Sequence, residues 1–189
     1  MHAGEFWGSI TRWASANAPA IVPHIPPGVS PLALARAESV LEFEIPVELK
    51  EFLLVHDGSG DICLHKLGVF MSLKMIMTCW DNEFDLWGDG QNDEWAKPDG
   101  PIQAKWFTRV WLPAIDTRCG DYSCIDLDPA INGREGQIIT WYHNAGPARV
   151  VAPSFGDLLA EFIEELEAGA YIAMVNEHGW PYLHYTKRP

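Results

Sequence analysis

The sequence predicts an α+β fold in one domain, with helices in the first half and an antiparallel meander of short strands in the second. Three observations predict it. Apolar residues recur at helical spacing as far as residue 87. From Arg109 onward the apolar period changes to two, and turns containing Asn-Gly or Gly-Pro separate the alternating segments. With 189 residues, of which 48% are hydrophobic, the chain is long enough to build one core.

Four helices are expected in the first half, at residues 4–16, 30–41, 46–57 and 72–87. A proline-rich connector separates the first two. Ser30 and Pro31 supply an N-cap and a first-turn proline for the second helix. Gly58 ends the third, because glycine accepts the left-handed backbone found at helix C-termini. The fourth, capped by Ser72, has the strongest helical periodicity, and a short strand at 67–71 precedes it.

Four strands are expected in the second half, at residues 109–115, 122–127, 137–142 and 148–152. A polar loop with several prolines and glycines leads to them as far as Lys105. Ser154 then caps a helix that runs past Leu166 and carries acidic residues on its outer face. Two last short strands are expected at 171–175 and 180–185.

The charge balance restricts the kinds of partner. The chain has 13 basic and 26 acidic residues, a formal charge of −13, which repels phosphate backbones and anionic lipid surfaces but attracts a basic protein. No stretch approaches the ~20 apolar residues of a membrane span. We therefore expect a cytoplasmic protein that binds neither nucleic acid nor membranes. Its four cysteines are expected to be reduced: Cys63, Cys79, Cys119 and Cys124.

Several ordered fragments carry a resemblance to a known family. They are Ile45–Phe52, His56–Gly58, Trp111–Asp116, Gly120–Pro129, Gly136–Ile139 and Val151–Phe155. In order and spacing they resemble the SMI1/KNR4 domain, the core of the SUKH superfamily. The resemblance divides the chain into an N-terminal helix and connector at 1–29, an SMI1/KNR4-like domain at 30–170 and a C-terminal extension at 171–189, expected to pack on the same domain.

The resemblance implies a fold in which several helices pack on a curved, mostly antiparallel sheet. It also implies a protein-binding role without catalytic residues. Members include bacterial immunity proteins that neutralise polymorphic toxins and fungal regulators of cell-wall synthesis. We therefore expect an immunity-type protein that binds a basic toxin domain, with a scaffold or regulatory protein as the alternative. The chain departs from the family pattern at the Thr117-Arg118-Cys119 turn and after Tyr171.

The candidate partner-binding residues combine acidic side chains with tryptophans that flank the acidic loop at 81–99. An exposed aromatic side chain amid charges is a common hot spot, although such loops are often only solvated. The candidates are Asp85, Asp89, Asp93, Glu94, Trp95, Trp106, Asp116, Asp121, Asp126 and Asp128.

Four of these aspartates raise an enzymatic alternative. Asp126 and Asp128 share one face of a strand, where with Asp116 and Asp121 they could hold a divalent cation in a metal-dependent hydrolase. The simpler interpretation is that the two are solvated opposite a buried face. Cys119, Cys124 and His143 lack the spacing of a zinc site, and no nucleotide-binding loop or hydrolase elbow is present. We expect no metal, no cofactor and no enzymatic activity.

Overall fold

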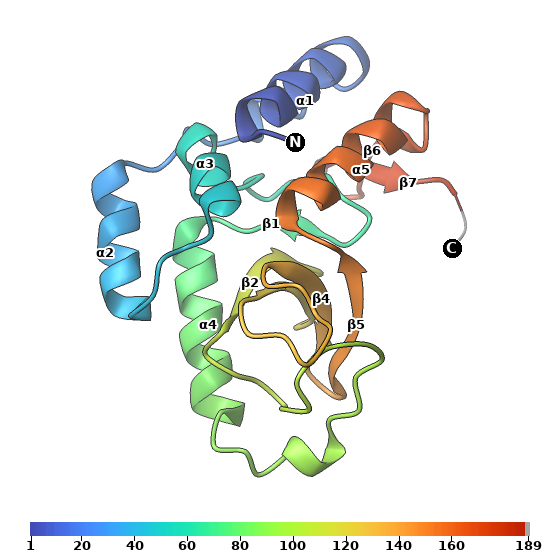
Figure 1. Ribbon diagram of the computed structural model, residues 1–189. Helices are drawn as coiled ribbons and strands as arrows, with labels where there is room; N and C mark the ends of the chain where they lie inside the picture. Colours follow the sequence, from blue (N-terminus) through green and yellow to red (C-terminus); the bar gives the residue numbers. More distant parts are fainter. Residues whose placement is uncertain (188–189) are drawn as a thin grey trace. The chain divides into compact units, whose positions relative to one another are not determined.

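A computed structural model describes residues 1–187 of the chain. Its contacts form two compact units, and Figure 1 colours the chain along its sequence. The first unit comprises residues 1–73 and the segment that begins at Leu159, and the second comprises Lys74–Leu158. The predicted α+β class, with several helices and antiparallel strands, is confirmed.

Helices dominate the first unit (Figure 1). They are α1 (Ala3–Asn17), α2 (Pro31–Leu41), α3 (Val47–Val55) and most of α5 (Phe155–Glu167), with the 3-10 turn η1 (Val22–His24) and the short strand β1 (Val69–Phe70). α2 begins where predicted, because the Ser30 hydroxyl accepts a hydrogen bond from the Ala33 N–H at 3.2 Å. α3 ends before Gly58, whose φ of 75° favours glycine and whose Cβ would lie 2.5 Å from the Phe70 carbonyl oxygen.

Phe6 is the centre of the core of the first unit. Its ring centroid lies 5.1 to 5.9 Å from those of four other aromatic residues, which come from α1, α3, β1 and α5: Trp7, Phe52, Phe70 and Phe162. All five side chains are buried. The N-terminal helix is therefore an integral part of this core.

The C-terminal hairpin is held to the first unit by a polar cluster. Strand β6 (Tyr171–Val175) pairs with β7 (Pro181–Tyr185) in antiparallel register. Lys66 Nζ lies 2.6 Å from Glu161 Oε1 and 2.9 Å from Glu165 Oε1, and the Tyr185 hydroxyl donates to the same Glu165 oxygen at 2.7 Å. The hairpin thus contacts α5 through Glu165. Residues 188–189 of the predicted extension lie outside the described part.

The second unit contains one long helix and an antiparallel meander. Helix α4 (Leu73–Trp87) leads to the 3-10 turn η2 (Asp93–Trp95), and the strands are β2 (Trp111–Asp116), β3 (Tyr122–Asp126), β4 (Gln137–Tyr142) and β5 (Gly146–Ala152). Each strand pairs with the next. Register shifts in the β2–β3 and β4–β5 pairs interrupt the ladder, an irregularity that bends strands. β5 begins two residues earlier than predicted, because Gly146 pairs with Tyr142.

Asp126 was expected to be solvated, and that prediction is wrong, because its side chain is completely buried. All five residues of β3 are buried, and a strand covered on both faces does not alternate. The Trp111 indole N–H and the Asp128 main-chain N–H donate to Asp126 Oδ1 at 3.0 and 3.2 Å, and Gln137 Nε2 donates to Oδ2 at 2.9 Å. Burial raises the pKa of Asp126, and these three donors partly oppose that effect.

His65 is a buried titratable group in the first unit. Its side chain is 2% exposed, its Nδ1 accepts a hydrogen bond from the Leu67 N–H at 3.1 Å, and its ring meets the Phe162 ring edge-on at 5.1 Å. Loss of hydration lowers the pKa of His65 to about 3, and the neighbouring Lys66 charge contributes.

We predict that His65 makes the fold acid-sensitive. The unfolded chain protonates this imidazole near pH 6.5, whereas the folded chain does so only near pH 3, so stability from the neutral ring is lost as the pH falls below 6.5. When the pH falls from 8 to 5, the lowered pKa of His65 should reduce the free energy of unfolding by about 2 kcal/mol. Urea unfolding of wild type and His65→Asn, which keeps an acceptor for the Leu67 N–H, measures the effect. Equal pH slopes for the two proteins would contradict it.

We predict that Asp126 is required for stability. Asp126→Ala leaves three donors without an acceptor and should lower the free energy of unfolding by about 3 kcal/mol. Asp128→Ala is the matched control, because it removes the same charge two residues away from an exposed side chain, and we expect a loss below about 1 kcal/mol. Chemical denaturation measures the free energy of unfolding of both variants. Similar losses for Asp126→Ala and Asp128→Ala would contradict a structural role for the buried Asp126 carboxylate.

Candidate protein-binding surface

All ten candidate residues lie in the second unit, and the structure divides them into two groups. Six have roles within the fold: Asp93, Trp106, Asp116, Asp121, Asp126 and Asp128. The other four are exposed: Asp85, Asp89, Glu94 and Trp95. Asp128 is exposed as well, but its carboxylate is held by Gln103. Asp89 accepts a hydrogen bond from the Gln91 N–H at 3.0 Å. Asp85, Glu94 and Trp95 are therefore the candidates that are both exposed and without a side-chain hydrogen bond among the described residues.

Trp106 was expected at the surface, and that prediction is wrong. Its side chain is only 8% exposed, its ring lies 5.9 Å from that of Trp87, and its carbonyl accepts a hydrogen bond from the indole of Trp141 at 2.6 Å. The backbone of Gly146 also lies against the indole face. Trp106 is followed by the buried Phe107. An apolar pair just before the predicted strand at 109–115 is the sequence signal that could have indicated this burial.

Asp93 fixes the acidic loop to the segment that contains Trp106. Its Oδ1 accepts a hydrogen bond from the Trp106 N–H at 2.8 Å, and its Oδ2 lies 2.8 Å from Lys105 Nζ. Partial burial alone would raise the pKa of Asp93, but the bonds from Lys105 and the Trp106 N–H lower it below its ordinary value. Because Asp93 is the first residue of η2, this contact orients the turn that presents Trp95.

Three further aspartates accept hydrogen bonds from loop or turn residues. Asp116 Oδ1 accepts from the Arg118 N–H at 2.7 Å and Asp128 Oδ2 from Gln103 Nε2 at 2.7 Å. Asp121 Oδ1 accepts from the His143 N–H at 3.1 Å. The first contact also shapes the unusual Thr117-Arg118-Cys119 turn, where Arg118 has a φ of 67°.

Metal binding by these aspartates has no geometric support in the described part of the chain. Within residues 1–187, no three or more His, Cys, Asp or Glu side chains gather in a way that could hold a metal ion. Cys124 is fully buried, which raises the pKa of its thiol well above the ordinary value, whereas Cys119 is exposed. The two cysteines thus lie in different surroundings, and neither belongs to a metal-holding group among the described residues.

Five exposed residues at the end of α4, in the loop that follows it and in η2 form what we name the acidic–aromatic patch: Asp85, Leu86, Asp89, Glu94 and Trp95. Leu86 and Trp95 are 64% and 63% exposed. Within the described part of the chain, the carboxylates of Asp85 and Glu94 make no hydrogen bond or ion pair. The sequence did not identify Leu86 as part of the site, although its position off the apolar stripe of α4 was a signal.

Short connections keep the patch together. Five residues join the end of α4 to η2, and the contacts among Trp87, Trp106 and Asp93 hold the two elements near each other. In Figure 1 the helix runs directly into the loop that carries η2. The patch thus combines two large apolar side chains with three carboxylates on one continuous segment.

Comparisons with known proteins identify regulators among the relatives. The chain is 25% identical to a glucan synthesis regulatory protein of Neurospora crassa and 25% identical to a cell wall biosynthesis/cell cycle regulator of Schizosaccharomyces pombe, over 87% and 89% of this chain. It is 24% identical to a cell wall assembly regulator of Saccharomyces cerevisiae, over 86% of this chain. The matches cover 38%, 37% and 40% of those proteins, so the chain spans about two fifths of the length of these relatives.

The model of one protein family matches residues 28–161, which include α2 to α4, the whole meander and the acidic–aromatic patch. No helix within residues 1–187 has the length and apolar character that crossing a bilayer requires. The matched segment covers more than half of the chain, and the protein belongs to the SMI1/KNR4 family (SUKH-1).

Proposed function

We propose that the chain is a non-enzymatic regulatory module that binds a protein partner through the acidic–aromatic patch. The observation that carries this proposal is the exposure of Trp95 and Leu86 close in sequence to the carboxylates of Asp85 and Glu94, which have no partner among the described residues. Tryptophan is enriched among residues that dominate binding energy, because a large ring gains much from removal of water. The regulatory names of the relatives support a role in regulation.

The charge of the surface favours a basic partner. The patch contains three carboxylates and no basic side chain, and the whole chain has a formal charge of −13. Complementary charge raises the rate of encounter and disfavours acidic competitors, while the apolar side chains supply most of the affinity. Association should therefore slow as the salt concentration rises.

The relatives favour the regulatory alternative over the immunity role. An immunity protein could use the same patch to occlude a basic toxin domain, but the named relatives are cell-wall and glucan-synthesis regulators. The two roles differ in the partner. A regulator binds a protein of its own cell, whereas an immunity protein binds a toxin encoded beside it.

We predict that Trp95→Ala weakens binding to the partner without unfolding the chain. Proteins captured from the source cells with the full chain as bait supply the partner, which is then purified and titrated by calorimetry. The substitution should raise Kd by about 30-fold, the equivalent of about 2 kcal/mol. The melting temperature should change little, because Trp95 is 63% exposed.

Ile131→Ala is the matched control. Ile131 is 90% exposed and belongs to the same unit, but it lies outside the patch. It should leave Kd unchanged, and Asp89→Lys should lower the association rate. A partner that binds Trp95→Ala and Ile131→Ala equally well would refute binding through the patch.

A further inference from the structure

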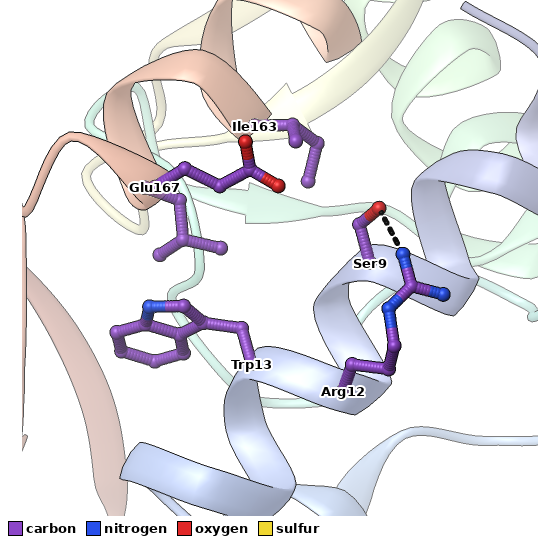
Figure 2. Close-up of a pocket in the computed structure, with 6 residues that line it drawn as sticks. Ser9, Arg12, Trp13, Ile163 and Glu167 are labelled. Atoms are coloured by element: carbon purple, nitrogen blue, oxygen red, sulfur yellow. Dashed lines mark hydrogen bonds between the residues drawn. The ribbon is translucent and has the colours of Figure 1, made fainter.

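A hollow lies between α1 and α5 in the first unit (Figure 2). Its volume is about 240 Å³, and its lining comes from the two helices: Ser9, Arg12, Trp13, Ile163, Leu166 and Glu167. All six residues lie outside the segment 28–161 that the family model matches. The hollow is thus a feature of the parts of this chain that flank the family segment.

The walls of the hollow are mainly apolar. Ile163 and Leu166 belong to the buried stripe of α5, and Trp13 of α1 is half-buried. Figure 2 shows the Trp13 ring along one side and Ile163 across the hollow from it. The volume is below the ~300–1,000 Å³ of pockets that hold drug-sized ligands. It fits one large side chain better than a nucleotide or a coenzyme.

The polar groups around the hollow are largely unused by the fold. Arg12 donates from a guanidinium nitrogen to the Ser9 hydroxyl at 3.0 Å, which holds the guanidinium beside the hollow (Figure 2). Within residues 1–187, neither the Glu167 carboxylate nor the indole N–H of Trp13 has a hydrogen-bond partner. Arg12 and Glu167 also form no ion pair with each other, although they line the same space.

We propose that this hollow binds a short segment of a partner protein that presents one large aliphatic side chain next to a lysine or arginine. The aliphatic side chain would contact Trp13, Ile163 and Leu166, and the neighbouring cation would meet Glu167. Arg12 and the Trp13 indole would donate to main-chain carbonyls of the segment. Glu164 is also exposed one turn before Glu167, so the α5 side carries two carboxylates against the single guanidinium of Arg12 on the α1 side. This balance favours a basic segment over an acidic one.

A capped tripeptide tests this proposal on the full chain. The probe is lysyl-leucyl-lysine, acetylated at its N-terminus and amidated at its C-terminus, added to ¹⁵N-labelled protein while NMR follows the indole N–H of Trp13. The Trp13→Phe variant assigns that signal. We expect a saturable shift with a Kd in the millimolar range, and Glu167→Gln should raise that Kd about two- to fivefold.

Matched controls separate the hollow from general charge attraction. Glu177→Gln removes the same charge from the turn between β6 and β7 and should leave the Kd unchanged. Lysyl-glycyl-lysine and glutamyl-leucyl-glutamate with the same caps should not saturate the signal. The proposal is overturned by no shift up to about 10 mM lysyl-leucyl-lysine, by equal binding of either control peptide, or by equal effects of the two variants. A Trp13 shift that depends on protein concentration alone would mean that a second copy fills the hollow, which also overturns it. None of these results bears on the acidic–aromatic patch.

Discussion

A carboxylate that leaves water must receive hydrogen bonds, and this constraint sorts the acidic residues of the second unit. Asp126 satisfies it with three donors in the interior, and Asp93 satisfies it with Lys105 and the Trp106 N–H. Each of these contacts fixes a segment of backbone. Because the Asp93 carboxylate binds Lys105 and the Trp106 N–H, the η2 turn has a fixed orientation, and its other residues Glu94 and Trp95 are exposed to solvent. The position of Glu94 and Trp95 in the acidic–aromatic patch therefore depends on the hydrogen bonds that Asp93 accepts.

In the first unit, aromatic packing holds the backbone segments together. The Phe6 cluster joins residues from α1, α3, β1 and α5, so the segments that flank the matched family region share a core with it. The same two helices, α1 and α5, leave the hollow beside Trp13. The family segment thus carries one proposed binding surface, and the flanking helices carry the other.

Much of the fold followed from local signals. Ser30 and Ser154 marked helix starts correctly, because caps act through neighbouring backbone groups. Gly58 was expected to end α3, but that helix ends at Val55 with an extended His56 as its C-cap. The site was harder to predict. Alternation placed Asp126 in solvent, but β3 is covered on both faces, and that covering depends on tertiary packing. Trp95 and Trp106 flank the same acidic loop, yet only Trp106 enters the interior. The sequence pattern identified the acidic loop at 81–99. It could not show which of the candidate residues have structural roles and which are exposed for binding.

We propose that the protein binds a partner through the end of α4 and η2. Hydrogen–deuterium exchange of the full chain, with and without its purified partner, tests it most directly. We predict that binding slows exchange in residues 84–97, which contain the patch, and leaves exchange in the turn around Ile131 unchanged. Protection that falls on other segments while 84–97 exchange at their free rate would contradict it.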